Sequence, residues 1–201
     1  MTIPIIILML GIVGAYLVGS VSSAIVVCRL MGLPDPRTSG SGNPGATNVL
    51  RLGGKRAAVI TLLGDVLKGF APVFIAGLFI DLPPVLAAVG LAAFLGHVFP
   101  VLFRFQGGKG VATAFGAIAG ISWPAALAVL GTWLLVAVIF RYSSLAALVS
   151  AFLAPFYTAY FAFEPVYISS ILLVVLVIIW RHRANIQKLL AGTEMKIGQK
   201  P

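Results

Sequence analysis

Charged side chains are scarce in this sequence: they make up only 9% of its 201 residues, whereas soluble domains carry about 25%. Hydrophobic residues make up 60%, and the mean hydropathy is +1.09. A water-soluble fold needs polar side chains to cover its surface, and this chain does not have enough of them. The composition therefore excludes a water-soluble enzyme and indicates a protein whose main solvent is lipid.

Cysteine and histidine are scarce as well. The single cysteine, Cys28, excludes an internal disulfide framework, a cysteine-rich zinc site and an iron–sulfur cluster. The two histidines, His97 and His182, are too few for a histidine-rich metal site. The five acidic residues form no cluster that suits a divalent ion. We therefore expect neither a metal nor a cofactor.

Apolar segments follow one another along most of the chain, and crossing a bilayer takes about 20 such residues. They predict an all-α integral membrane protein with a single transmembrane helical domain over residues 1–201. Its seven predicted transmembrane helices cover residues 3–28, 57–80, 82–103, 111–121, 125–140, 144–163 and 166–180.

The stretch 111–140 allows two topologies, one long helix or a hairpin that turns near Pro124. With the hairpin the N-terminus lies outside, the C-terminus is cytoplasmic, and the basic residues fall inside, as the positive-inside rule requires. The cytoplasmic parts are then the loops 29–56, 104–110 and 141–143 and the tail 181–201. We therefore expect seven spans, and we attribute the net charge of +9 to topology and to attraction for anionic headgroups and substrates, not to nucleic acid.

The first cytoplasmic loop is rich in glycine between residues 33 and 50. Its glycines allow backbone conformations in which successive N–H groups point at one spot, a geometry that binds phosphate oxygens. A flexible surface turn is the alternative. Polar side chains that could add donors or charge are Ser41, Asn43, Thr47, Asn48 and Arg51.

A second glycine-rich turn, residues 106–110, opens directly into a predicted helix. Backbone amides, the positive end of the helix dipole and a lysine suit a bound phosphate. The turn is not a Walker A loop, because Gly110 follows Lys109 where that motif has Ser or Thr. A tight connector with a topogenic lysine is the alternative. The candidate residues here are Gly107, Gly108, Lys109, Gly110 and Thr113.

The tail after the last span, residues 181–194, forms a third candidate segment. If the helix continues through it, His182, Asn185 and Leu189 share one face with Ile186. Polar groups then lie on the stripe that contacts the bundle. The alternative is a tail helix that rests on the lipid headgroups.

Two charged residues, Asp65 and Lys68, lie within a predicted span. Each costs about 2.5–3.5 kcal/mol near the centre of a span, so such residues usually face the interior of the bundle and have a function. The alternative is that they only pair with each other. His97, inside the next span, is expected to be a packing residue.

Five segments in order resemble one family, the bacterial acyl-phosphate:glycerol-3-phosphate acyltransferases of the PlsY type. They are residues 40–48 (GSGNPGATN), 64–69 (GDVLKG), 96–103 (GHVFPVLF), 107–113 (GGKGVAT) and 182–186 (HRANI), followed by Leu189, Gly192 and Glu194. The resemblance covers nearly the whole chain. It implies an enzyme of the bacterial cytoplasmic membrane that transfers a fatty acyl group from acyl phosphate to the 1-hydroxyl of glycerol 3-phosphate. The products are lysophosphatidic acid and inorganic phosphate, and the active site faces the cytoplasm.

By this resemblance the catalytic residues are Ser41, Asn43, His182 and Asn185. The substrate-binding residues are Thr47, Asn48, Arg51, Lys68, Gly107, Gly108, Lys109, Gly110 and Thr113. We hypothesise that the second glycine-rich turn holds the phosphate of glycerol 3-phosphate, while Ser41, Asn43, Arg51, His182 and Asn185 line the acyl phosphate. The proton of the attacking hydroxyl goes either to His182 or to a substrate phosphate. Asp65 and Lys68 are expected to position or support the pocket.

Other functions are compatible with the same loops. A small multi-pass carrier for phosphorylated anions would use them to recruit its solute, but the outer half of the predicted bundle has few polar residues for a transport path. A structural scaffold would tolerate substitutions in the glycine-rich loops. The sequence leaves the oligomeric state, the acyl-chain preference and the lipid dependence open.

Overall fold

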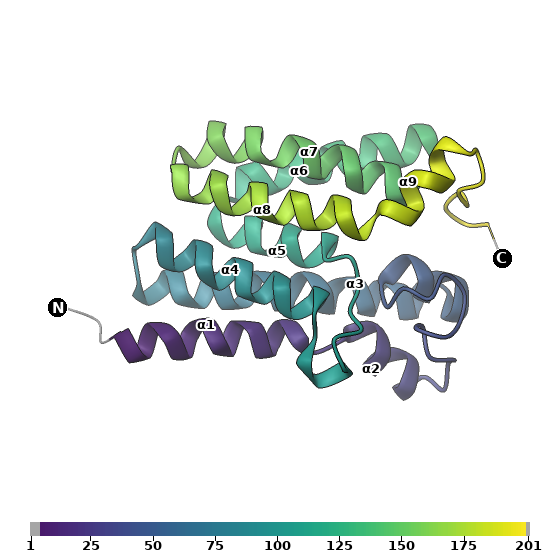
Figure 1. Ribbon diagram of the computed structural model, residues 1–201, viewed down its shortest axis with the longest axis horizontal. Helices are drawn as coiled ribbons and strands as arrows, with labels where there is room; N and C mark the ends of the chain where they lie inside the picture. Colours follow the sequence, from purple (N-terminus) through teal and green to yellow (C-terminus); the bar gives the residue numbers. More distant parts are fainter. Residues whose placement is uncertain (1–4, 200–201) are drawn as a thin grey trace.

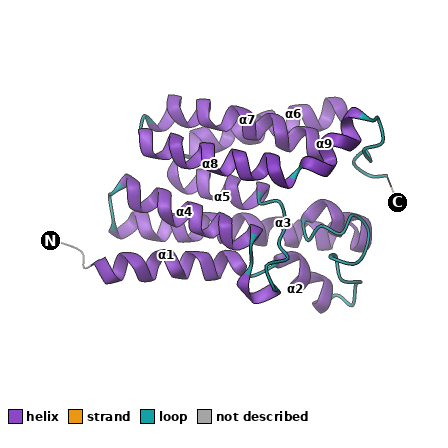
Figure 2. Cartoon of the chain, viewed as in Figure 1, coloured by secondary structure: helices purple, strands orange, loops and turns teal. Residues whose placement is uncertain are grey.

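The computed structural model describes residues 5–199. Within that range the chain forms helices and loops and no strand (Figure 2). The helices are α1 (Ile5–Ser20), α2 (Ser23–Leu30), α3 (Ala46–Phe79), α4 (Pro83–Val98), the 3-10 turn η1 (Val101–Phe103), α5 (Val111–Ile121), α6 (Trp123–Phe140), α7 (Ser143–Ala162), α8 (Pro165–Arg181) and α9 (Arg183–Leu190).

The long helices lie side by side along the longest axis of the molecule, and successive ones run in opposite directions (Figure 1). Extensive contacts join α3 to α5, α1 to α4 and α6 to α7. The short helices α2 and α9 and the loop between α2 and α3 gather at one end of this bundle (Figure 1). The polar segments of the sequence are thus concentrated at that end.

The predicted segments 111–121, 125–140, 144–163 and 166–180 coincide with α5 to α8 to within a few residues. The first predicted segment, residues 3–28, is divided into two helices within the described part, because the chain bends by 43° between α1 and α2. At the bend Ser22 caps α2 by accepting a hydrogen bond from the Ile25 amide at 3.4 Å. Both segments are apolar, so the run of hydrophobic residues in the sequence did not reveal the bend.

Two further boundaries differ from expectation. Residues 46–53, predicted as loop, are helical and join the main part of α3 through a kink at Gly54, whose φ of 74° is in the left-handed region. The helix over residues 181–194 is interrupted at His182, where α8 and α9 meet at 59°. The His182 amide donates to the carbonyls of Ile178 and Ile179, both at 3.0 Å, which closes the end of α8.

By length and apolar composition, α3, α4 with η1, α6 and α7 can each cross a bilayer, and the bent pairs α1–α2 and α8–α9 bring the number among the described residues to six. Helix α5, with 11 residues, is only about 16 Å long. It is enclosed by its neighbours and packs closely on α3, because Gly69 and Gly116 have no side chain between the two backbones. A methyl group on Gly69 would overlap the carbonyl of Thr113.

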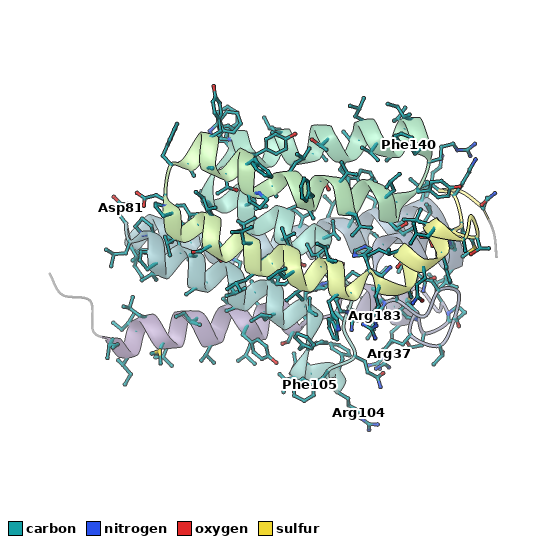
Figure 3. All side chains as sticks on the ribbon, turned by 45° about the horizontal axis from the view of Figure 1, so that its top comes forward. Arg37, Asp81, Arg104, Phe105, Phe140 and Arg183 are labelled. Carbon is teal, nitrogen blue, oxygen red and sulfur yellow. The ribbon has the colours of Figure 1, made fainter. Side chains whose placement is uncertain are left out.

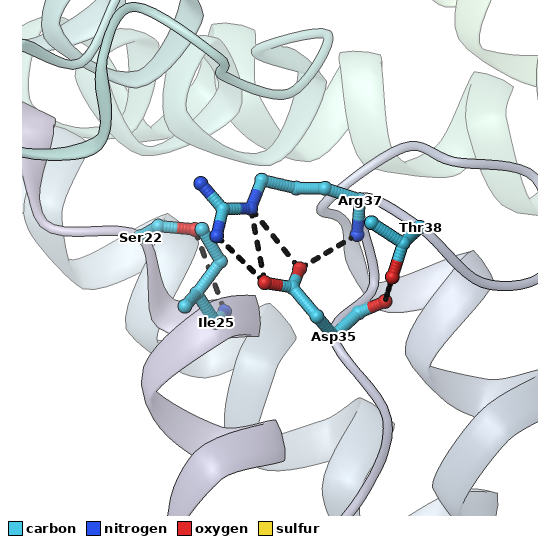
Figure 4. A network of polar contacts seen from close by, with 5 residues as sticks. All are labelled: Ser22, Ile25, Asp35, Arg37 and Thr38. Atoms are coloured by element: carbon cyan, nitrogen blue, oxygen red, sulfur yellow. Dashed lines mark hydrogen bonds and ion pairs between the residues drawn. The ribbon is translucent and has the colours of Figure 1, made fainter.

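The loop between α2 and α3 is organised by an ion pair (Figure 4). The Arg37 guanidinium contacts the Asp35 carboxylate at 2.6 Å, and the Arg37 amide donates to the same carboxylate at 2.9 Å. These contacts hold the pKa of Asp35 below its usual range. The Thr38 hydroxyl also donates to the Asp35 carbonyl at 3.3 Å, so this part of the loop is a defined turn.

Candidate anion-binding site

The turn before α5 is held tightly by its surroundings. Gly110 ends it with a φ of 82°, and a methyl group there would overlap the ring of Phe94. The Gly108 amide donates to the His97 carbonyl at 3.2 Å, and the Gly107 carbonyl accepts from Arg181 at 2.7 Å. These contacts fix the position of Lys109, the residue between the last two glycines.

Lys109 connects the turn to the tail of the chain. Its ammonium group donates to the side-chain oxygen of Asn185 in α9. The amide nitrogen of Asn185 donates to Glu194 at 2.7 Å, and Glu194 also accepts from the Ser144 hydroxyl of α7 at 2.6 Å. One continuous polar chain therefore joins the starts of α5 and α7 to α9 and the residues after it.

The electrostatic environment of Lys109 is strongly positive. Burial is the main cause that lowers the pKa of Lys109 to about 8; Glu194 raises this pKa, and the charges of Arg181, Lys188 and Arg51 lower it. Among the described residues that act on Lys109, the carboxylate of Glu194 is thus outnumbered by the cations of Arg181, Lys188 and Arg51. An anion bound here would be attracted by all of them.

His182 lies beside this group and is 3% exposed. Its Nδ1 is 2.8 Å from the Ile178 carbonyl, which can only accept, so Nδ1 carries the proton and Nε2 the lone pair. Burial and the charge of Lys109 lower the pKa of His182 to about 4. The imidazole is therefore neutral near pH 7.

The first glycine-rich loop uses several of its amides internally. The Ser41 amide donates to the Asn48 side chain at 2.9 Å, the Gly42 amide to Ser39 at 3.2 Å and the Gly45 amide to Asn43 at 2.9 Å. In this structure these three amides therefore donate within the loop. The Ser41 side chain remains exposed, and that of Asn43 is partly buried.

The structure brings some predicted site residues together and separates others. Lys109 and Asn185 are in contact, and Arg51 and His182 belong to the same electrostatic group. Thr47, at the start of α3, is 3.1 Å from the Ser143 hydroxyl at the start of α7. This places the end of the first loop beside α7, whose Ser144 donates to Glu194.

Three predicted binding residues lie away from this group. Asn48 is 1% exposed, and its side-chain amide donates within the loop to the carbonyls of Pro36 at 2.9 Å and Ser39 at 3.0 Å. Thr113 is fully buried between helices. Lys68 is buried against Asp65 inside the bundle. None of the three side chains has a surface that a substrate can reach in this conformation.

Sequence reasoning missed Ser143, Ser144 and Arg181, and it noted Glu194 only as part of a motif. No spacing rule relates these residues to Lys109. Among residues 5–199, no three His, Cys, Asp or Glu side chains gather in a way that could hold a metal ion.

A small apolar cleft of about 20 Å³ lies between α5, α6, α7 and α8. Its lining includes Val111, the first residue of α5, and Ile178, one turn before His182. The cleft therefore runs from the polar group into the apolar bundle. Its lining further includes Ala114, Phe115, Ile118 and Val175.

The fold and the site define the class: a multi-pass membrane protein with a cationic, glycine-shaped site at one end of its helices. The family model described as glycerol-3-phosphate acyltransferase matches residues 9–192, and the chain belongs to this family. A glycerol-3-phosphate acyltransferase of Thioalkalivibrio sulfidiphilus is 60% identical over 190 residues, which cover 94% of this chain and 93% of that protein.

Two crystal structures of PlsY, an integral membrane glycerol 3-phosphate acyltransferase, have the same fold. The glycerol 3-phosphate form superposes with a TM-score of 0.90 at 40% identity, covering 95% of this chain and 96% of that one. The lysophosphatidic acid form gives a TM-score of 0.87 at 39% identity, covering 95% of both chains.

Proposed function

We propose that this protein transfers a fatty acyl group from acyl phosphate to the 1-hydroxyl of glycerol 3-phosphate. The hydroxyl oxygen attacks the acyl carbonyl, the bond between that carbonyl carbon and the phosphate oxygen breaks, and the products are lysophosphatidic acid and inorganic phosphate. The observation that carries the proposal is the contact of Lys109 with Asn185, since it assembles one cationic site from distant segments. Family membership and the forms in which PlsY was crystallised support the substrate and the product.

In this proposal Lys109 attracts the phosphate of glycerol 3-phosphate, the turn 107–110 shapes the place where it binds, and Arg51 lines the acyl phosphate. His182, Asn185, Ser41 and Asn43 lie at the acyl phosphate and stabilise the charge that develops on its carbonyl. The acyl chain extends along the apolar helix surfaces next to the narrow cleft that begins at Val111. An acyl phosphate is a mixed anhydride with a good leaving group, so no acyl-enzyme intermediate is needed.

The proton of the attacking hydroxyl has two candidate acceptors, His182 and a substrate phosphate. A pKa of about 4 makes His182 a weak base near pH 7, whereas the second pKa of a phosphate monoester is about 6. The chemistry therefore favours the substrate phosphate as proton acceptor. His182 then contributes its neutral imidazole as a hydrogen-bonding group.

We also propose that the chain crosses the bacterial cytoplasmic membrane seven times, with α5 as the short fourth span and the site facing the cytoplasm. Alternating helix directions support this topology (Figure 1). Asp81 lies at the end of the bundle opposite to Arg37 and Arg183 (Figure 3). The positive-inside rule assigns the basic end to the cytoplasm.

The test is an assay of the detergent-solubilised protein with glycerol 3-phosphate and a long-chain acyl phosphate. We expect lysophosphatidic acid and inorganic phosphate to form in equal amounts, with acyl-CoA as a control donor that gives no product. Detergent abolishes any gradient, so a carrier would show no turnover. Absence of both products with acyl phosphate as donor would contradict the proposed function.

A further inference from the structure

A second polar group lies deep in the bundle, apart from the substrate site. Asp65 and Lys68 of α3 and His97 of α4 are 3%, 6% and 7% exposed. Lys68 Nζ is 2.8 Å and His97 Nδ1 is 3.5 Å from the same oxygen of Asp65. Buried charges in a span are costly, so a group of this kind needs a reason beyond pairing.

The group is connected to the bend between α1 and α2. Lys68 Nζ donates to the carbonyl of Val21 at 2.8 Å. Val21 lies in the break between the two helices, where the regular helical hydrogen bonds are interrupted. Lys68 therefore joins α3 to this break as well as to Asp65.

On its other side the group contacts the glycine turn. The Gly108 amide donates to the His97 carbonyl, and a methyl group on Gly108 would overlap Nε2 and Cε1 of the His97 ring. A methyl group on Gly107 would overlap the carbonyls of His97 and Val98. The turn therefore packs directly against the backbone and the imidazole of His97. The contact is made at Gly108, the residue before Lys109.

The His97 ring therefore lies between a carboxylate and the turn: Nδ1 faces Asp65, and Nε2 faces Gly108. We propose that Asp65, Lys68 and His97 are positioning residues that hold the turn 107–110, and with it Lys109, in the geometry that binds glycerol 3-phosphate. This inference rests on the proposed function for its kinetic consequence only. The effect on the turn itself is independent of any substrate.

The variant that separates positioning from folding is the double substitution Asp65→Asn/Lys68→Met. Removing one charge of a buried pair leaves the other unpaired and destabilises strongly, whereas removing both together is often tolerated. Thr61→Val is the matched control, because Thr61 lies one turn before Asp65 on the same helix and is fully buried, and its hydroxyl has no hydrogen-bond partner among the described residues.

Two readouts are measured on the full-length protein in detergent. Amide hydrogen exchange at Gly108 reports the hydrogen bond to His97 directly, and steady-state kinetics report KM for glycerol 3-phosphate and kcat. We expect faster exchange at Gly108 and a KM raised about 10- to 100-fold in the double variant, with a smaller change in kcat. Thr61→Val should keep wild-type values of both.

If the double variant shows the same Gly108 exchange rate and the same KM for glycerol 3-phosphate as the wild-type protein, the positioning role is contradicted. His97→Gln is the second variant, since it keeps a polar side chain but removes the ring beside Gly108. If the double variant does not fold, Gly108 exchange and KM for glycerol 3-phosphate in His97→Gln test the positioning role in the same way. If the wild-type protein itself makes no lysophosphatidic acid, the proposed function fails, while the exchange result still tests the positioning of the turn.

Discussion

Lys109 donates a hydrogen bond to Asn185, a residue 76 positions later in the chain. The first residue lies in the turn before α5 and the second in α9, after the last long helix. Because Asn185 also donates to Glu194, the contact links a cation to a carboxylate through a neutral amide. The functional end of the molecule is organised around this relationship.

Replacing Lys109 with alanine should raise KM for glycerol 3-phosphate about 10- to 100-fold, because the substrate phosphate loses a charge-assisted contact worth about 1.5–3 kcal/mol. Initial rates at varied glycerol 3-phosphate measure the change. Lys55→Ala is the control, since Lys55 is an exposed base outside the site, and it should leave KM unchanged. An unchanged KM in Lys109→Ala would remove the residue from phosphate binding.

The rate should fall on the alkaline side near the pKa of Lys109. This pKa is lowered to about 8, so the ammonium group loses its proton as the pH rises through 8, and kcat/KM for glycerol 3-phosphate declines. Lys109→Arg should remove the decline, because a guanidinium stays charged throughout this range. A pH profile of kcat/KM between pH 6 and 10 for both proteins is the measurement. An identical decline in the arginine variant would mean that a group other than Lys109 causes the decline.

Glu194→Gln should move the same alkaline decline to lower pH. The carboxylate of Glu194 raises the pKa of Lys109 against the effect of burial, so its removal lowers that pKa further. The amide oxygen of glutamine can still accept from Ser144 and Asn185. Ser144→Ala, which loses only one hydrogen bond to Glu194, serves as the control and should leave the position of the decline in place.

His182→Gln should retain part of the turnover if a substrate phosphate accepts the proton. The pKa of His182 is lowered to about 4, so the imidazole gains a proton only under acidic conditions and adds no titration between pH 6 and 8. Single-turnover rates of wild type and variant make the comparison. A loss of several orders of magnitude in the variant would identify His182 as the base.

Gly110→Ala should lower thermal stability. A residue with a side chain costs about 1–2 kcal/mol in the left-handed region, and the added methyl overlaps Phe94. Gly131→Ala is the matched control, because no atom lies within 4 Å of a methyl group placed there. Thermal unfolding followed by circular dichroism compares the two, and equal melting temperatures would contradict the description of the turn.

Local patterns predicted much of the fold and part of the site. The apolar segments gave the positions of α5 to α8, and the glycines around Lys109 indicated a shaped turn at the start of a helix, where the structure has one. These features depend on neighbouring residues only. The break at Val21 also has a partner elsewhere in the chain, since Lys68 donates to the Val21 carbonyl, and hydropathy does not report such contacts.

Side-chain orientation was the part that could not be predicted. Asn48 and Thr113 have residue types and positions that suit substrate binding, yet the Asn48 side chain donates to its own loop and Thr113 is fully buried. Ser144 has no local signal, and its proximity to Glu194 follows from how α7 packs beside the tail. Such roles are set by tertiary packing.

The most direct test of the account is a double-mutant cycle on Lys109 and Asn185, with kcat/KM for glycerol 3-phosphate as the measured quantity. If the two residues form one site, the effects of Lys109→Ala and Asn185→Ala should be non-additive, with a coupling energy of about 0.5–3 kcal/mol. Effects that add to within about 0.5 kcal/mol would mean that the two residues act independently, and a single site assembled from the turn and the tail would be contradicted.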